Sequence, residues 1–481
     1  MNINITNSIE EARALLGNEK NISSALRVSI ELILTLVTLI INKKGLNSKN
    51  SSIPPSQDPN REKESRAKGK RKVGGQKGHE GRTLKAVEEP DEIKILKVDK
   101  RKLPKGKYQV VGYDKRQVFD IDISTIVTEY QAEILVNEKG QRFVAPFPKE
   151  VKSKVQYGLG VKANAVYMSQ YQLIPYNRVE EHFDEQMNLG ISAGTIYNFN
   201  VEAYEKLAIF EAWLINSMRK EPLLHADETG VNIAGKRNWL HSASNGKYTY
   251  FTVDEKRGQE AMDRAGVLPD FKGILVHDHW KPYYKYKEMT HALCNAHHIR
   301  ELQRIIDHDK KEWAKEIIEL LKEMNNQVHE SPNSALSKDK TKEYQQKYDD
   351  ILEKAQKESP PPDESTRKAG QRGRLKRTKS RALLERLINF KDDVLRFLDN
   401  PLVPFTNNQG ENDIRMTKVH QKISGSFRSK KGAEIFCRVR SYLSTCRKHD
   451  VSSSLALELL FRGKLPLFVQ GLNSCDCIGI F

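Results

Sequence analysis

Three acidic residues in this chain stand where carboxylates could act together. Asp227 and Asp278 each end a short apolar run that is typical of a buried strand, and Glu411 opens a predicted helix. A buried carboxylate carries a desolvation cost unless a cation meets it, and three converging carboxylates would also repel one another. A pair of Mg²⁺ ions would remove both penalties and, about 4 Å apart, would suit phosphoryl transfer.

Each of the three acids also has a structural explanation. A single aspartate at a strand end is more often a turn or a helix cap, and Glu411 could be a first-turn acid that the helix dipole stabilises. Glu228 follows Asp227 but points to the other face of the strand, so only one of the two can be a core ligand. Composition and spacing leave these roles open.

The elements that must position the acids are strands with an intervening helix. Residues 257–265 predict the helix, and the order of elements suits an α/β sheet of mixed direction. The apolar runs predict strands at 223–227, 238–243, 248–253 and 273–278.

Composition sets the broad class. The 481 residues allow two to four domains, and 80 Lys and Arg against 63 Asp and Glu give a net charge of +17. This excess favours an anionic partner, usually nucleic acid, although many basic proteins bind none. The five cysteines are scattered and no signal peptide is recognisable, so we expect a reducing cytoplasm without disulfides. The most apolar segment, 26–41, is shorter than the about 20 residues of a membrane span.

Segments before the sheet carry further expectations. Residues 9–43 predict one helix, mostly apolar from residue 26, that either oligomerises or docks on the body of the chain. Residues 61–82 hold nine basic residues against three acidic ones, which would follow a phosphate backbone or form a solvated linker. Alternating runs predict a small antiparallel β module with strands at 93–98, 117–123 and 126–134.

A helical pair is predicted directly before the sheet. Residues 174–183 and 193–207 have helical character, and a break with a glycine at 188–191 separates them. Ser192 can cap the second helix. Two helices around a short turn fit a DNA-binding helix-turn-helix, but helical hairpins that bind no DNA are commoner.

The sequence resembles the transposases of the bacterial insertion-sequence family numbered sixty-six, which belong to the DDE class and have an RNase H-like catalytic core. The resemblance implies that Asp227, Asp278 and Glu411 are the catalytic and metal-binding acids. It further implies two Mg²⁺ ions, for which Mn²⁺ would substitute, cleavage at transposon ends, and joining of the freed 3′-hydroxyl to target DNA. The matching motifs are Asn50-Ser51-Ser52-Ile53-Pro54-Pro55-Ser56, Gly74-Gly75-Gln76-Lys77-Gly78-His79-Glu80-Gly81, Tyr113-Asp114-Lys115-Arg116-Gln117-Val118-Phe119-Asp120, His225-Ala226-Asp227-Glu228-Thr229, and Pro404-Phe405-Thr406-Asn407-Asn408-Gln409-Gly410-Glu411-Asn412-Asp413-Ile414-Arg415.

The cysteines depart from the family pattern. Family members carry a small zinc module with paired cysteines, but residues 83–150 contain none, so we predict no zinc and a module held by β pairing alone. Cys294 and His297 are three residues apart and could share one helix face, yet they are too few ligands for a metal site. Related DDE enzymes place such a pair after the second aspartate, which implies that Cys294, His297 and Arg300 support the active site or grip DNA.

These inferences combine into a multidomain α+β protein. Its RNase H-like α/β core would be a mixed sheet flanked by helices and interrupted by a helical insertion. The expected parts are an oligomerisation helix (1–45), a basic linker (46–82), a β module (83–155), a helix-turn-helix-like region (156–215), the core (216–300 and 401–440), the insertion (301–400) and a helical tail (441–481). The expected DNA-binding residues are Lys68, Lys70, Arg71, Lys72, Arg374, Lys376, Arg377, Arg415, Lys418 and Arg428.

The expected partners follow from the same inferences. We expect double-stranded DNA at transposon ends and target, a homo-oligomer, small accessory transposition proteins as in the family, and no membrane. The location would be the bacterial cytoplasm at the nucleoid. The alternatives are a catalytically inactive DNA-binding regulator and an RNase H-like nuclease that does not join DNA.

Overall fold

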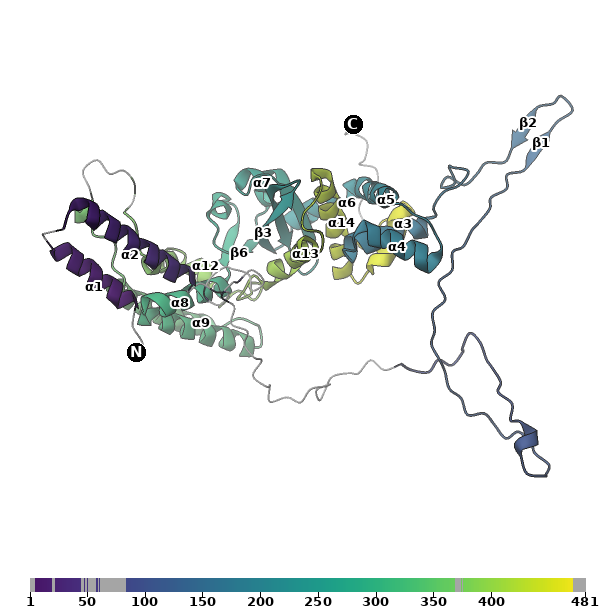
Figure 1. The fold of residues 1–481 in the computed structure, drawn as a ribbon, viewed down its shortest axis with the longest axis horizontal. Coiled ribbons are helices and arrows are strands. Elements are labelled where there is room, and N and C mark those ends of the chain that lie inside the picture. The colour runs from purple at the N-terminus through teal and green to yellow at the C-terminus, as the bar shows by residue number, and fades with distance from the viewer. Residues whose placement is uncertain are drawn as a thin grey trace.

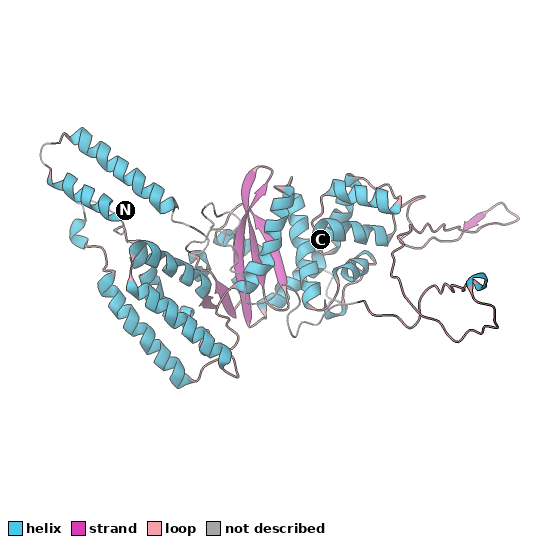
Figure 2. Ribbon diagram, turned by 60° about the horizontal axis from the view of Figure 1, so that its bottom comes forward, coloured by secondary structure: helices cyan, strands magenta, loops and turns pink. Residues whose placement is uncertain are grey.

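The computed structural model describes residues 5–19, 22–44, 47, 50, 58, 60, 84–367, 373 and 375–469. A five-stranded sheet lies in the middle of an elongated molecule, with a helical insertion on one side and a helical bundle on the other (Figures 1 and 2). Most of the basic linker and the tail after residue 469 lie outside the described residues.

The central sheet is of mixed direction, as predicted. Its strands are β3 (Leu223–Ile233), β4 (Lys236–Ser244), β5 (Thr249–Asp254), β6 (Ile274–His277) and β7 (Thr290–Leu293), in the order β5-β4-β3-β6-β7. The first three pair antiparallel, whereas β6 and β7 run parallel to β3. The sequence analysis did not predict β7, which is only four residues long.

One boundary of the sheet corrects the sequence prediction. β3 continues to Ile233, so Asp227 lies inside the strand and not at its end. The extension is paired with β4 through a two-residue turn at Ala234 and Gly235, both with positive φ. The polar run after Asp227 suggested a turn, but cross-strand hydrogen bonding decides where a strand ends.

Helices cover both faces of the sheet and form three apolar clusters. One cluster joins β3 and β5 to the helical bundle, which consists of α3 (Leu159–Val166), α4 (Tyr176–Met187), α5 (Ala193–Lys206), α6 (Ala208–Arg219), α14 (Lys430–Lys448) and α15 (Ser453–Phe461), and to α7 (Gln259–Ala265). A second joins β6 and β7 to the insertion, which consists of α8 (Asn295–Asp309), α9 (Glu312–Glu330), α10 (Lys338–Glu358), α11 (Lys379–Asn389) and α12 (Lys391–Leu395). The third lies where α13 (Asn408–Ser424) crosses β3 and β4.

The helical pair before the sheet has the predicted boundaries within a few residues. α4 ends at Met187, and the positive φ of 47° at Asn188 turns the chain out of the helix. The hydroxyl of Ser192 then accepts a hydrogen bond from the backbone NH of Thr195 at 3.2 Å and caps α5. A π-helical turn at Tyr167–Tyr171 leads from α3 towards this pair.

The N-terminal helix is two helices, α1 (Ile5–Asn18) and α2 (Ser24–Lys44), which corrects the single helix predicted over 9–43. The hydroxyl of Ser23 accepts a hydrogen bond from the backbone NH of Leu26 at 3.3 Å, so a helix start interrupts the apolar pattern. Among the described residues, no helix is long and apolar enough to cross a membrane.

The predicted β module is a single hairpin. β1 (Ile134–Val136) pairs antiparallel with β2 (Arg142–Val144), and a 3₁₀ turn lies at Lys100–Lys102. The runs 93–98 and 117–123 have no regular secondary structure and no strand partner among the described residues. Val118 and Ile121 are 91% and 82% exposed, so these runs have no second layer on which to bury a face. A module held by β pairing was therefore a wrong prediction beyond this hairpin.

Candidate active site

Two of the predicted acids lie close together at the end of the β3–β6 pairing. β3 and β6 pair in parallel as far as His225 opposite Val276; Asp227 lies two residues further along β3, and Asp278 directly follows β6. Adjacent strands are about 4.8 Å apart, so the two side chains start from neighbouring positions. The backbone NH of Glu228 donates to Asp227 Oδ1 at 2.9 Å, and the backbone NH of Trp280 donates to Asp278 Oδ1 at 3.0 Å.

The third acid reaches this place through the helix α13, which starts beside the sheet. Asn407, directly before α13, is 1% exposed and joins three parts of the core. Its side chain bonds His225 Nδ1 at 2.7 Å and donates to the Ala226 carbonyl at 2.9 Å, and its backbone NH donates to Cys294 Sγ at 3.1 Å. Glu411 lies one helical turn later, close enough for its charge to act on Asp227.

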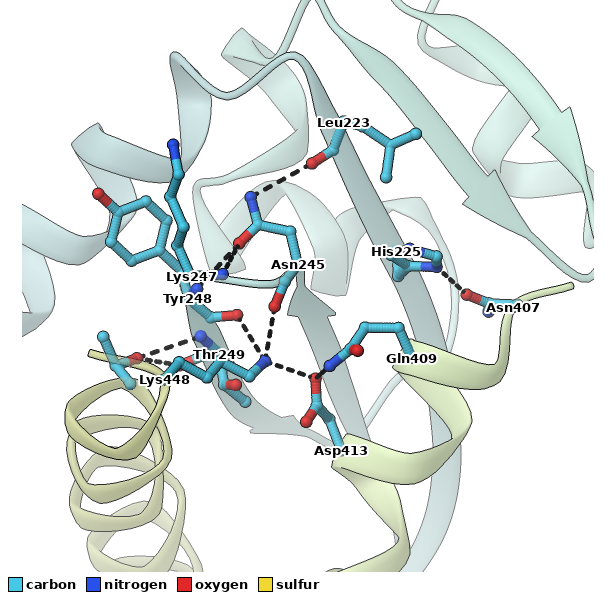
Figure 3. A network of polar contacts seen from close by, with 11 residues as sticks. Leu223, His225, Asn245, Lys247, Tyr248, Thr249, Asn407, Gln409, Asp413 and Lys448 are labelled. Carbon is cyan, nitrogen blue, oxygen red and sulfur yellow. Dashed lines mark hydrogen bonds and ion pairs between the residues drawn. The ribbon is translucent and has the colours of Figure 1, made fainter. Parts of the chain in front are cut away.

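A glycine and a buried ion pair hold the start of α13 in place. A Cβ on Gly410 would lie 3.0 Å from Asn407 Oδ1, so a larger residue would push against this amide. Further along, Asp413 Oδ2 accepts from Gln409 at 2.9 Å and from Lys448 Nζ at 2.8 Å. Figure 3 shows Lys448 reaching from α14 to Asp413 and to the carbonyl oxygens of the turn at Asn245. Glu411 is thus presented by a helix that is fixed on two sides.

Asp227 is the acid whose charge the surroundings oppose most. Burial raises the pKa of its carboxyl well above the usual range, and the neighbouring carboxylates of Glu228, Asp278 and Glu411 raise it further. Lys418 Nζ lies on the same side but donates to the Gly230 carbonyl at 3.0 Å, and burial lowers its pKa. Divalent cations are the partners that would let all these acids ionise together.

Glu228 faces the other side of the strand and has partners of its own. Its side chain is 1% exposed. Tyr283 donates to Oε2 at 2.7 Å, and Arg257 Nε donates to Oε1 at 2.9 Å. Arg257 is also stacked over Trp239 and Trp280. Burial and the nearby charge of Asp278 raise the pKa of Glu228 despite these bonds, but both carboxylate oxygens are in use. This carboxylate is part of a structural ion pair.

Glu411 also meets the cluster of Cys294, His297 and Arg300. Its Oε1 lies 3.8 Å from His297 Nδ1 and 3.6 Å from Arg300 Nη2. Both Glu411 Oε1 and His297 Nδ1 are buried without a hydrogen-bond partner. The ligand atoms of Cys294, His297 and Glu411 all lie within 4.8 Å of one another, which places a third donor beside a pair that the sequence left incomplete.

The predicted DNA-binding cations have different surroundings. Lys68, Lys70, Arg71, Lys72 and Arg374 lie outside the described residues. Lys376, Arg415 and Arg428 are exposed, the last beside the tip of the β3–β4 hairpin, where Ala234 bonds to Phe427. Arg377, by contrast, is paired with Glu385.

Asn407 and Lys448 are the site residues that the sequence analysis did not assign. Asn407 lies in the quoted motif before α13, and an asparagine three residues before a glycine was its only local signal. The partners of its side chain are 181 and 182 residues away in the chain, and Lys448 likewise bonds carbonyls about 200 residues away. Such contacts exist only once the sheet and the late helices are assembled.

Known proteins share parts of this chain. Residues 154–435, which hold the sheet, the insertion and α13, match the model of the Transposase IS66 family, and residues 4–85 match a family of unknown function, DUF6444. A 70-residue stretch is 36% identical to the uncharacterized protein y4jO of Sinorhizobium fredii (strain NBRC 101917 / NGR234), covering 15% of this chain and 22% of that protein. Because the first match spans more than half of the chain, this protein belongs to the IS66 family of transposases.

Proposed function

We propose that this chain is a DDE-type DNA transposase that cuts insertion-sequence ends and joins the 3′-hydroxyl to target DNA. The observation that carries the proposal is the proximity of Asp227 on β3 to Asp278, directly after the parallel strand β6, and to Glu411 near the start of α13, since the charges of both acids act on Asp227. The strand order, with three antiparallel strands followed by two parallel ones, also supports an RNase H-like core.

The three acids fit a pair of Mg²⁺ ions. Their donors are hard carboxylate oxygens, and Glu411 Oε1 is buried without a hydrogen-bond partner. Burial among other carboxylates raises the pKa of Asp227, which is the penalty that a divalent cation removes. When bound, two such ions supply an activated attacking oxygen and stabilise the leaving one. Mn²⁺ also suits carboxylate ligands and would substitute.

The chain's own residues would do the positioning. Asp227 and Asp278 would be held by the sheet, and Asn407 would fix the start of the helix that carries Glu411. Arg300, 3.6 Å from Glu411, would hold this carboxylate until a cation competes for it. Arg415 and Lys418, one and two turns further along α13, would meet the phosphates of the strand being cut.

The other parts would bind DNA and assemble the complex. The basic linker, the hairpin region and the α4–α5 pair would grip the transposon end, because a net charge of +17 attracts a phosphate backbone. α2 exposes at least half of the area of six large apolar side chains and so supports a homo-oligomer. Those side chains are Leu26, Val28, Leu32, Ile33, Leu36 and Ile40. Accessory transposition proteins and the bacterial nucleoid are further expected partners.

Substitution of each acid tests the proposal. Asp227→Ala, Asp278→Ala and Glu411→Ala should each abolish strand transfer with Mg²⁺ while binding of end DNA stays within about twofold. Asp399→Ala, which removes an exposed acid after α12, should leave both unchanged. Strand transfer retained by any of the three would remove that acid from the site. A wild-type chain that binds ends without cutting would be a regulator, and one that cuts without joining pre-cleaved ends would be a nuclease.

A further inference from the structure

A cavity of about 700 Å³ lies between the catalytic core and the helical insertion. The core side contributes His279, which directly follows Asp278, and the 3₁₀ turn η4 (Lys281–Lys285). The insertion contributes residues of α8 and α11. His279 has a positive φ of 69°, a conformation that non-glycine residues seldom adopt, so the chain turns sharply right after the second acid. Whatever fills this cavity is a close neighbour of the proposed cleavage site.

The cavity holds positive charge that the protein does not neutralise. Arg304, Lys281 and Lys379 line it, and none of them forms an ion pair with any residue that the structure describes. Arg304 Nε and the ring nitrogen Nδ1 of His279 are buried without a hydrogen-bond partner. Burial and the neighbouring Arg304 lower the pKa of Lys379. The charge of Asp309, which does not line the cavity, opposes this shift but forms no ion pair with Lys379. Cations this close together in the wall of a cavity favour an anion.

The acids in the wall of the cavity are already paired. Glu301 binds Arg386, and Glu385 binds both Arg377 and Arg381. Because these acids and bases neutralise one another, the net positive charge of the cavity wall comes from the three unpaired cations Arg304, Lys281 and Lys379. A phosphate group is the anion that suits an arginine and lysines together, since the guanidinium can donate two bonds and the ammonium groups act as point charges.

The cavity also offers aromatic rings to a base. The rings of His279 and Phe390 meet edge to face at 4.4 Å, and Tyr284 lies 4.7 Å from Phe390. Aromatic side chains beside a positively charged groove are the usual means of binding single-stranded nucleic acid, because every base can stack. A space of this size takes one or two nucleotides but no duplex.

We propose that this cavity binds an unpaired nucleotide of the DNA next to the strand held at Asp278. Its phosphate would lie between Arg304 and Lys379, and its base would stack on the rings of His279, Tyr284 and Phe390. The inference rests on the proposed transposase function and gives the helical insertion a part in it. The insertion would supply half of a single-strand site, so cleavage would require base pairs beside the cut to open.

The test is photocrosslinking of the full chain to an oligonucleotide of about ten bases that carries 5-iodouracil, in a chelator that prevents cleavage. Mass spectrometry of the peptides should locate crosslinks at residues 279–284 or at Phe390. A blunt duplex with the same base should crosslink much less, and free deoxynucleotides should not compete at equal phosphate concentration. Crosslinks confined to other basic segments, equal reaction of the duplex, or displacement by free nucleotides would overturn the proposal.

Three single neutralisations make the test specific. Arg304→Gln and Lys379→Gln should each lower the crosslink yield at least threefold, whereas Lys322→Gln, which removes an exposed charge on α9, should not. The logarithm of the binding constant falls linearly with the logarithm of the salt concentration, and loss of one phosphate contact should make this slope shallower by about 0.7 for a single strand. Between 50 and 200 mM salt, the variant's affinity should therefore fall by a factor about 2.6-fold smaller than that of the unsubstituted protein. Lys379 is exposed, so its variant keeps the test valid if Arg304→Gln fails to fold.

The outcome separates this proposal from the proposed function. If Lys379→Gln gives the same crosslink yield as Lys322→Gln and the protein still cuts transposon ends, the nucleotide site is rejected and the transposase function is kept. Site-specific crosslinks in a protein that cuts no DNA would support the nucleotide site and reject the transposase.

Discussion

Asp227→Asn should make the metal-free protein more stable, which is the opposite of what most substitutions in a core do. Asp227 on β3 and Asp278, which directly follows the adjacent strand β6, start about 5 Å apart, the spacing of neighbouring strands. Two unit charges at about 5 Å repel by about 3 kcal/mol at an effective dielectric constant of about 20. The amide keeps the bond from the NH of Glu228 and removes one charge.

Protonation limits the gain and fixes its pH dependence. Burial raises the pKa of Asp227 above its ordinary value of 3.8, so the folded chain binds more protons than the unfolded one between the two values. Stability of the unsubstituted protein therefore falls as pH rises through this window. Protonating a carboxyl of pKa about 4 at pH 7 costs about 4 kcal/mol, and this cost is the upper bound on the stabilisation that Asp227→Asn can give. We expect Asp227→Asn to stabilise by about 1–3 kcal/mol at pH 7 and by nothing below about pH 4.

Mg²⁺ should make the unsubstituted protein more stable than Asp227→Asn, which reverses the order expected without metal. A ligand at one hundred times its dissociation constant stabilises the folded state by about 2.7 kcal/mol, and only the unsubstituted protein keeps all three acids. The assay is urea unfolding in chelator and in Mg²⁺, at pH 7 and pH 4. Tryptophan fluorescence reports the core, because Trp239 lies on β4 and Trp280 follows Asp278 by two residues.

A second acid on α13 provides the matched control. Asp413→Asn also neutralises an acid near the site, but it breaks the ion pair with Lys448. The side chains of Asp413 and Lys448 are each 15% exposed. It should destabilise by about 1–3 kcal/mol, because a buried cation loses its partner. The reasoning fails if Asp227→Asn is no more stable than the unsubstituted protein in chelator at pH 7, or if its gain persists at pH 4.

Two further substitutions test the surroundings of the acids. Asn407→Ala should lower the free energy of unfolding, measured in urea, by about 2–4 kcal/mol, because His225 Nδ1 and the Ala226 carbonyl each lose a buried partner. A decrease below about 0.5 kcal/mol would show that neither hydrogen bond contributes to stability. Glu228→Gln should lower stability by weakening the pair with Arg257, yet an end-cleavage assay should find most of the activity retained. Complete loss of cleavage in a folded Glu228→Gln would instead make it a ligand.

Local patterns in the sequence predicted much of the sheet and its helices. Period-two and apolar runs located four of the five central strands, and Ser192 marked the start of α5. These predictions succeed because strand and helix periodicity is written in consecutive residues. The same signals overpredicted the β module, since alternation at 117–123 gives strand propensity without the second layer that stabilises a sheet.

The sequence by itself determined which residues could form the site: an aspartate after each of two apolar runs, and a glutamate at a helix start. Only the tertiary structure decided how they meet. The parallel pairing of β3 and β6 brings Asp227 near Asp278, which directly follows β6, and Asn407 anchors the start of the helix that carries Glu411. It also gave both carboxylate oxygens of Glu228 partners of their own and left the cavity cations unpaired. The reason is that the partners of a charged side chain lie tens to hundreds of residues away in the chain, whereas the periodicity of a helix or strand covers only consecutive residues.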